Sequence, residues 1–142
     1  MTIQAILERN PHPIISITGK TSVAEAVSLL AAKRIGALPV VEGDAVLGIF
    51  SERDVIYSLE REGAAALDRP VAEVMTAPAV TSEPETTALG ALSLMTQRRI
   101  RHLPVIEGGR MVGFISIGDL VKYRIDKIEA EANAMLEYIQ SV

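Results

Sequence analysis

The sequence predicts a mixed α/β (α+β) fold made of two tandem copies of one β-α-β-β-α unit, and three observations support this prediction. The chain repeats itself without a gap at an offset of 65 residues, which carries Pro39 onto Pro104. Hydrophobic residues make up 49% of the chain and aromatic residues only 4%, which indicates an aliphatic core suited to helix and sheet. Segments with helical periodicity alternate with short β-rich segments. Because the chain has only 142 residues, we expect both copies to share one compact module.

The first copy begins with a helix and a hairpin. Ser22 and Glu25 have the spacing of a capping box, and apolar residues then recur at helical intervals, which predicts a helix. Residues 38–41 and 46–50 are β-rich and flank a Gly-containing turn, so they should pair as a hairpin. Since proline cannot donate to a sheet ladder, Pro39 should place the first strand at a sheet edge or stand at a strand start.

A second helix is predicted after Ser51, and the second copy repeats the whole plan. The apolar side of this second helix should carry Val55, Ile56 and Leu59. In the second copy, Thr86 or Thr87 caps the first helix, and residues 103–106 and 111–115 form the strands. Both copies are therefore expected to form the same elements in the same order.

The boundaries of the copies follow from the same offset. We expect the first repeat to span residues 3–62, a connector with the next lead-in to span 63–78, and the second repeat to span 71–125. Residues 71–75 have the pattern of a single helical turn, and their counterparts at the 65-residue offset are residues 6–10. The lead-in segment is therefore duplicated as well.

The last helix, residues 120–142, continues beyond the second copy without Gly or Pro. Its apolar residues alternate in steps of four and three, as in a coiled-coil seam: Val121, Ile125, Ile128, Ala132, Met135, Ile139 and Val142. The charged residues Lys127, Glu129, Glu131 and Glu137 lie off this seam. Two interpretations stay open at this point, a dimerisation helix and a tail that packs on its own domain.

Composition and motif content argue against several classes of function. A net charge of −4 gives no electrostatic attraction for a nucleic acid, and no segment approaches the roughly 20 apolar residues that cross a membrane. The amino terminus lacks the features of a secretion signal, so we expect a soluble, cytoplasmic protein. With no cysteine and two histidines, a zinc site is improbable. Glycine-rich phosphate loops and nucleophile-elbow patterns are absent, so no enzymatic turnover is expected.

One combination of motifs occurs twice in register. Leu-Pro-Val, a hairpin and then Gly-hydrophobic-hydrophobic-Ser-x-x-Asp appear in each copy, and Val71-Ala-Glu-Val-Met-Thr leads into the second. This combination resembles the cystathionine β-synthase (CBS) domain family over residues 3 to 125. The resemblance implies a free-standing CBS pair, or Bateman module, whose copies pack about a pseudo-twofold axis and leave two clefts. In this family such clefts often bind adenine nucleotides, and two pairs usually associate as a disc.

The Ser-x-x-Asp motifs, Ser51 to Asp54 and Ser116 to Asp119, carry the candidate chemistry. The resemblance implies that each aspartate accepts hydrogen bonds from ribose hydroxyls, while the serine and the helix N-terminus meet phosphate. Spacing alone favours a different role, because Ser-x-x-Asp is also a helix N-cap pattern that satisfies backbone donors. The sequence therefore leaves both roles open for these aspartates, ribose binding and helix capping.

The resemblance assigns further residues to two clefts, each using the lead-in of one copy and the Ser-x-x-Asp of the other. The Asp119 cleft would be formed with Ile15, Ile35, Arg101, His102, Ser116 and Gly118. The Asp54 cleft would be formed with Gly36, Ala37, Ser51, Arg53, Val80 and Ile100. Arg53 adds a positive charge that its counterpart Gly118 cannot supply, so the clefts should not be equivalent. The apolar members could also be ordinary core, and His102 could be a surface or a proton-sensitive group.

These expectations define a function and its alternative. The chain should be a homodimeric regulatory module that associates through its CBS faces and its C-terminal helix, with no obligatory cofactor. AMP is the preferred ligand, because a cleft with only one or two basic side chains suits a ligand with few phosphate groups. ATP, ADP, NAD(H) and S-adenosylmethionine remain open as ligands. The alternative is a ligand-free dimeric interaction module. The downstream protein partner cannot be named from the sequence.

Overall fold

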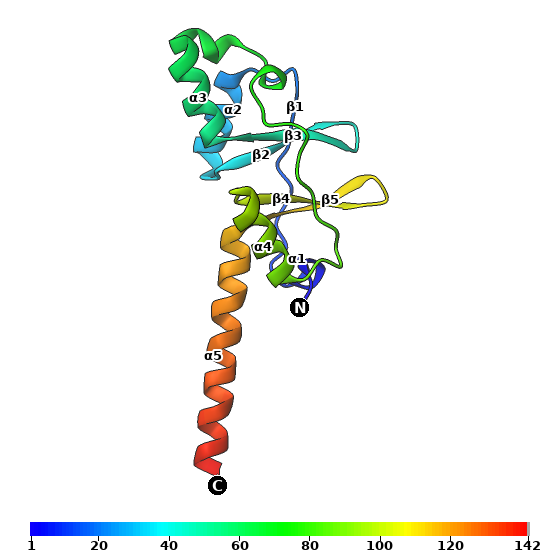
Figure 1. Cartoon of the computed structure of the whole chain (residues 1–142), viewed down its shortest axis with the longest axis vertical. Helices are drawn as coiled ribbons and strands as arrows, with labels where there is room; N and C mark the ends of the chain where they lie inside the picture. The colour runs from blue at the N-terminus through cyan, green and yellow to red at the C-terminus, as the bar shows by residue number, and fades with distance from the viewer. Residues whose placement is uncertain (142) are drawn as a thin grey trace.

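The computed structural model describes residues 1–141 as two stacked halves from which one long helix extends (Figure 1). The first half contains β1 (Ile17–Thr18), α2 (Val23–Lys33), β2 (Ala37–Glu42), β3 (Ala45–Ser51) and α3 (Glu52–Glu62). The second half contains α4 (Ala88–Arg98), β4 (His102–Glu107), β5 (Arg110–Ser116) and α5 (Ile117–Ser141). The lead-in and connector contain α1 (Ile3–Arg9) and the short 3₁₀ helices η1 (Gly63–Asp68) and η2 (Val71–Glu73). The predicted α/β architecture, with its helical turns at both lead-ins, is confirmed.

The sheets differ between the halves in one respect. In the first half, β1 pairs in parallel with β2, and β2 pairs antiparallel with β3. In the second half only β4 and β5 form a sheet, and the expected lead-in strand is reduced to an isolated bridge between Ser82 and Val105. The prediction of a full first strand in this copy is therefore wrong.

Of the two positions predicted for Pro39, the sheet edge is wrong, because β2 is the central strand of its sheet, whereas a place near the strand start fits, since β2 begins at Ala37. Proline is tolerated there because the parallel pairing with β1 starts at Val40, one residue after Pro39. The helix caps agree with the sequence. Ser22 accepts a hydrogen bond from the Glu25 amide at 3.1 Å, and Thr87 rather than Thr86 caps α4.

The lead-in segments cross over between the halves. Ile3 and Ile6 of α1 are buried in the core of the second half, whereas Val71 of η2 is buried in the core of the first half. Backbone hydrogen bonds of 2.8 Å join Ile3 to Thr86 and Val71 to Thr21, at the starts of the segments that enter α4 and α2. Each half therefore completes its core with a segment from the other copy, which brings the lead-in of one copy to the strands of the other.

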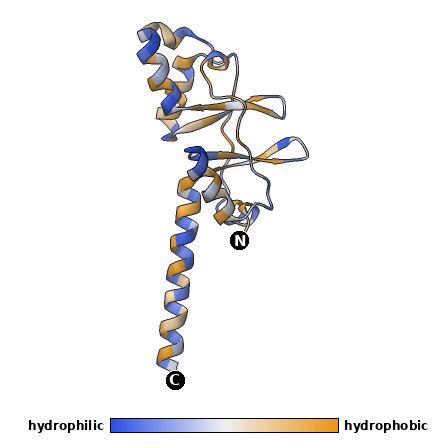
Figure 2. Cartoon of the chain, in the orientation of Figure 1, coloured by the Kyte–Doolittle hydropathy of each residue, from blue (hydrophilic) through white to orange (hydrophobic). Residues whose placement is uncertain are grey.

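Beyond Tyr123, which packs against the core of the second half, α5 leaves the rest of the molecule (Figures 1 and 2). Among its described residues only Leu120 is buried, and the seam residues Ile125 and Ile128 are about half exposed, at 50% and 49%. The interpretation of this helix as a tail packed on its own domain is therefore wrong, because the helix extends where its own module has no surface to cover it. Val142, the last predicted seam residue, lies outside the described residues.

Candidate functional site

A hollow of about 290 Å³, here called the Asp119 cleft, opens between the two halves. Its lining comes from the lead-in, from the turn between α2 and β2, and from β4, β5 and the start of α5. The lining residues are His12, Pro13, Ile14, Ile15, Ile35, Ala37, His102, Phe114, Ser116 and Asp119. The structure thus brings Ile15, Ile35, His102, Ser116 and Asp119 together in one cleft. Ala37, which the sequence placed with the other cleft, lies here too.

The turn after α2 positions Ile35 in this cleft. The helix ends at Arg34, which adopts a left-handed conformation with φ of 53°, and the Ile35 amide then donates to the Leu30 carbonyl at 3.1 Å. The next residue is Gly36, whose close neighbours leave little room for a side chain. A Cβ on Gly36 would lie 2.9 Å from Glu52 Oε1 and 3.6 Å from His102 Cε1. The tight contact is thus with the end of the Glu52 side chain, and the His102 ring lies at ordinary contact distance from this turn.

Asp119 acts as a cap and still has a free oxygen. The Ser116 amide donates to Asp119 Oδ2 at 2.9 Å, and the Asp119 amide donates to Ser116 Oγ at 3.2 Å. His12 Nε2 lies 3.8 Å from the same Oδ2. Within residues 1–141, Asp119 Oδ1 accepts no hydrogen bond, and the residue is partly exposed. The two roles weighed from the sequence are therefore compatible, because capping occupies only one of the two oxygens.

Asp54, at the same position in the first copy, has a different environment. Its Oδ2 accepts hydrogen bonds from the Ser51 amide at 2.9 Å and the Ser51 hydroxyl at 3.2 Å, while its Oδ1 accepts one from the Thr76 hydroxyl at 2.9 Å. Thr76 is held in place by backbone hydrogen bonds of 2.9 Å in both directions with Ile49. Asp54 is only 8% exposed. Both oxygens of this carboxylate are thus occupied by the protein itself.

The remaining candidate residues are more scattered. Arg53 is exposed, and its Nη1 donates to the Arg99 carbonyl at 3.2 Å. Val80 and Ile100 are partly buried and pack against the core of the second half, which fits the ordinary-core interpretation considered for them. The exposed Arg101 and Gly118 do not line the Asp119 cleft, although both adjoin residues that do.

His102 is the titratable group with the most distinctive surroundings in the cleft. Its ring stacks on Phe114 with centroids 5.5 Å apart and planes 15° from parallel, and it pairs with Ser116 across the β4–β5 ladder. Burial lowers the pKa of His102 below its ordinary value of 6.5, against the opposing effect of the Asp119 and Glu52 carboxylates; nearby Arg101 also lowers it. The imidazole is therefore neutral at pH 7, and with Phe114 it presents a flat aromatic surface in the cleft that Asp119 also lines.

Four lining residues were missed as candidates: His12, Pro13, Ile14 and Phe114. Phe114 could have been found, because residues two apart in a strand share a face and Phe114 stands two before Ser116. The others belong to the lead-in, and their position depends on the crossing of that segment to the opposite half. No local pattern in the sequence indicates that crossing.

A second hollow of about 470 Å³ lies between α2 and α3. It is largely apolar and is lined by Val27, Leu30, Ala31, Arg34, Ile35, Gly36, Glu52, Val55 and Ile56. Next to it, Ile56, Tyr57 and Leu59 on α3 are exposed, at 63%, 54% and 38%. The predicted apolar side of this helix is therefore only partly buried. No Ser-x-x-Asp pair lines this hollow, so we assign the candidate ligand site to the Asp119 cleft.

Two other kinds of site can be assessed for the described part of the chain. Across residues 1–141, no three His, Asp or Glu side chains converge as a metal site would require. Of the helices in this range, none combines the length and apolar character needed to cross a membrane.

Comparison with known proteins assigns the family. The CBS domain model matches residues 7–61 and again residues 71–126. The chain belongs to the CBS domain family. It is 37% identical over 128 residues to the mitochondrial CBS domain-containing protein CBSX3 of Arabidopsis thaliana, covering 87% of this chain but only 62% of that protein. The chain thus spans less than two thirds of this relative's length.

Solved CBS structures share the architecture. The crystal structure of the CBS-domain protein ATU1752 from Agrobacterium tumefaciens is 38% identical, with a TM-score of 0.84 over 87% of this chain and 99% of that one. CBSX2, solved in complex with AMP, is 24% identical, with a TM-score of 0.70 over 80% of this chain and 88% of that one. The CBS pair of MJ0100, solved with 5-methylthioadenosine and S-adenosyl-L-methionine, is 22% identical, with a TM-score of 0.78 over 89% of this chain and 98% of that one.

Proposed function

We propose that this chain is a regulatory CBS pair that binds an adenine nucleotide, preferably AMP, in the Asp119 cleft. The observation that carries the proposal is the free Oδ1 of Asp119 in a hollow lined from both copies. A carboxylate with an open acceptor suits the hydroxyls of a ribose, which are hydrogen-bond donors. The cap formed with Ser116 fixes the orientation of that carboxylate before any ligand arrives.

The other groups of the cleft fit the remaining parts of a nucleotide. Ile15 and Ile35 offer apolar contact, and the His102–Phe114 stack offers a flat surface for a base. Phosphate would lie toward Ser116 and the N-terminus of α5, where the helix dipole favours an anion. The volume of about 290 Å³ is at the lower end of the range of about 300 to 1,000 Å³ that is common for ligand pockets. This size favours a mononucleotide over NAD(H).

The ligands of CBSX2 and MJ0100 support an adenosyl compound as the class. Because both proteins are less than 25% identical to this chain, they show that this fold can hold such compounds, and no more. The choice of AMP over S-adenosylmethionine, ATP or ADP therefore rests on the cleft of this chain.

Binding would act as a signal because the cleft joins the two copies. A ligand that contacts both copies stabilises the arrangement in which they are closest, and it changes an equilibrium only through such a difference in affinity. We infer a cytoplasmic homodimer that reports nucleotide level to another protein. A carboxylate that holds sugar hydroxyls binds without breaking a bond, so no turnover is expected.

Calorimetry of the purified chain with AMP, ATP and NADH tests the proposal. We expect the tightest binding for AMP, with one molecule per chain because Asp54 has no free oxygen. Mass spectrometry of small molecules released on denaturation would identify a ligand that copurifies. No heat with any of the three compounds would favour the ligand-free interaction module, and consumption of a bound nucleotide would favour an enzyme.

A further inference from the structure

Past Leu120, α5 carries an apolar stripe that nothing in its own module covers. Ile128, Met135 and Ile139 are 49%, 59% and 61% exposed, and Figure 2 shows apolar bands along the helix. A continuous apolar stripe of this length in water marks an interaction surface. Its spacing selects the kind of partner, because alternating steps of four and three fit another helix with the same spacing.

We propose that a second copy of this chain covers the stripe, and that the two α5 helices form a parallel two-stranded coiled coil with both modules at the same end. This inference rests on the homodimer of the proposed function and adds its orientation. In heptad terms, the a positions are Ile125, Ala132 and Ile139, and the d positions are Val121, Ile128 and Met135. The β-branched Ile125 and Ile139 are residues that two-stranded parallel coils favour at a, although the d positions carry Val, Ile and Met where that pattern has Leu.

The charges that flank the stripe favour the parallel arrangement. Arg124 and Glu131 occupy g positions, and Lys122 and Glu129 occupy e positions. In a parallel pair, each g residue faces the e residue five positions later on the other helix. Arg124 therefore faces the partner's Glu129, and symmetry makes this opposite-charge pair occur twice. None of the other g-to-e contacts in this range joins like charges.

An antiparallel pair over the full stripe places like charges together. Its apolar layers would set Ile125 opposite the partner's Met135, and the stripe would be covered equally well. At the centre, however, Glu129 would face the partner's Glu129 and Glu131 would face the partner's Glu131, which is repulsive. A shifted antiparallel register would bring Arg124 to the partner's Glu131. That shift carries Met135 and Ile139 past the end of the partner's stripe and leaves them without a partner layer.

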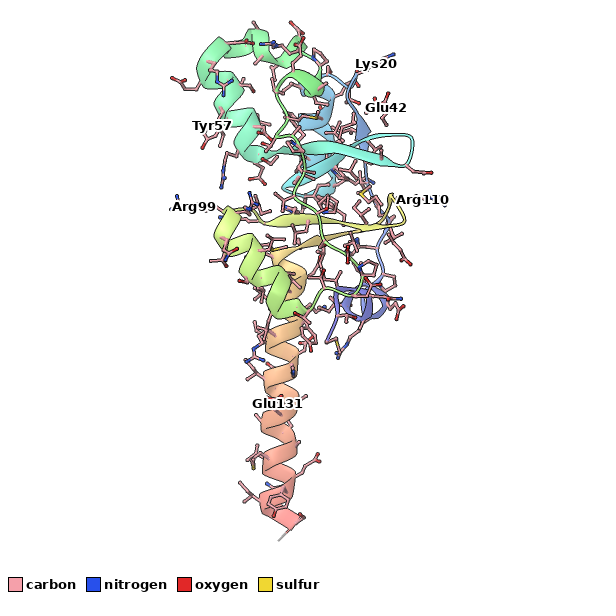
Figure 3. All side chains as sticks on the ribbon, turned by 45° about the vertical axis from the view of Figure 1, so that its right-hand side comes forward. Lys20, Glu42, Tyr57, Arg99, Arg110 and Glu131 are labelled. Carbon is pink, nitrogen blue, oxygen red and sulfur yellow. The ribbon has the colours of Figure 1, made fainter. Side chains whose placement is uncertain are left out.

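The module carries a second exposed apolar surface. In Figure 1, α2 and α3 lie above the first hairpin while α4 and α5 lie below the second, and Tyr57 on α3 points away from the strands (Figure 3). The exposed α3 residues Ile56, Tyr57 and Leu59 lie next to the apolar hollow between α2 and α3. About three heptads form only a weak coil by themselves, so the module face is expected to contribute to the dimer.

Cysteine crosslinking tests the orientation cleanly, because the chain has no cysteine of its own. In the parallel coil, Met135→Cys places two sulfurs in one d layer, and Ile125→Cys does the same in an a layer, so each variant alone should oxidise to a covalent dimer. In the antiparallel coil, neither variant should crosslink alone, whereas a mixture of the two should. The matched control is Glu137→Cys, at an outward f position, which should stay monomeric on a denaturing gel under either arrangement.

Sedimentation equilibrium tests the dimer itself. We expect the wild-type chain to be dimeric and Ile128→Glu, an exposed change outside the module, to weaken the dimer at least tenfold. A monomeric wild-type chain, or crosslinking only in the mixed sample, would overturn the inference. AMP calorimetry on the same samples keeps the two proposals apart, because a crosslinked dimer without AMP binding would refute the ligand proposal alone. AMP binding by a monomeric wild-type chain would refute only the dimer proposal.

Discussion

The two repeats place an aspartate at the same position, yet Asp54 and Asp119 have different environments. Both cap a helix, through Ser51 and Ser116 respectively. Asp54 is buried with both oxygens hydrogen-bonded, whereas Asp119 keeps one oxygen free at an open cleft. The same motif therefore serves the fold in one half and is available to a ligand in the other.

The difference originates in the lead-in segments rather than in the motif. At the 65-residue offset Thr76 corresponds to Pro11, and Ile49 corresponds to Phe114. Thr76 gives its hydroxyl to Asp54 and exchanges two backbone hydrogen bonds with Ile49. Proline has neither a hydroxyl nor an amide hydrogen, so Pro11 cannot make the equivalent bonds. Phe114 is left to stack on His102 and line the cleft, which stays open.

The largest expected effect is on ligand affinity. Asp119→Asn retains a carbonyl oxygen for the Ser116 amide but replaces the free acceptor with an NH₂ group, which cannot accept a hydrogen bond. Loss of charged hydrogen bonds to ribose should weaken AMP binding about one hundredfold, or about 2.7 kcal/mol. Calorimetry measures this loss of AMP affinity. The matched change Asp54→Asn should leave the affinity unaltered, and an equal loss in both variants would contradict the assignment of one binding cleft.

The free energy of unfolding should depend more on Asp54 than on Asp119, which is the reverse of the order expected for AMP affinity. Asp54→Ala leaves the Thr76 hydroxyl and the Ser51 amide without their acceptor in a buried setting, at a cost of about 2.5 kcal/mol. Asp119→Ala removes a partly exposed cap, at a cost of about 1 kcal/mol. Urea unfolding measures both costs. If the two midpoints shift by the same amount, the two carboxylates do not differ as described.

Gly48 and Gly113, which face the two lead-in segments, allow a further comparison of the two halves. A Cβ at Gly48 would lie 2.6 Å from the backbone oxygen of Thr76, whereas a Cβ at Gly113 would lie 2.5 Å from Cδ1 of Leu7, the end of a flexible side chain. Backbone cannot yield as a side chain can, so Gly48→Ala should cost about 2 kcal/mol and Gly113→Ala about 1 kcal/mol or less. Thermal and urea unfolding test this order. A Gly113→Ala variant that is the less stable of the two would show that the Thr76 segment is not held tightly.

Much of the fold follows from local signals in the sequence. The repeat, the caps at Ser22 and Thr87, and the β-rich segments around Pro39 and Pro104 predict the helices and hairpins that the structure contains. The grouping of Ile15 and Ile35 with Asp119 needed the family resemblance, because apolar residues alone do not reveal which cleft they line. The coiled-coil spacing of α5 was visible, but only the structure excludes packing on its own module.

The occupied state of Asp54 could not be predicted. It depends on a hydrogen bond between Thr76 and a residue 22 positions away, which forms only because the lead-in crosses to the other half. The offset does show that Thr76 stands opposite Pro11, but not that the hydroxyl would reach Asp54. Similarly, Val80 and Ile100 match family positions, yet their environment is the core of the second half. The environments of these residues depend on long-range packing, which local sequence patterns do not predict.

The smallest expected effect concerns His102, whose counterpart in the first copy is the buried Ala37. Burial lowers the pKa of His102 below 6.5, while Asp119 and Glu52 oppose this and Arg101 reinforces it; His12 also faces Asp119. Since the unfolded chain binds the proton more readily, the contribution of a neutral His102 is present above pH 6.5 and is lost as pH falls through the lowered pKa. Urea unfolding from about pH 7.5 to about pH 5.5 should therefore show a stability that declines more steeply in the wild type than in His102→Ala. The His12→Ala variant is the control for the second histidine. If stability declines with pH equally steeply in the wild type and in His102→Ala, the His102 imidazole is solvated in the open cleft.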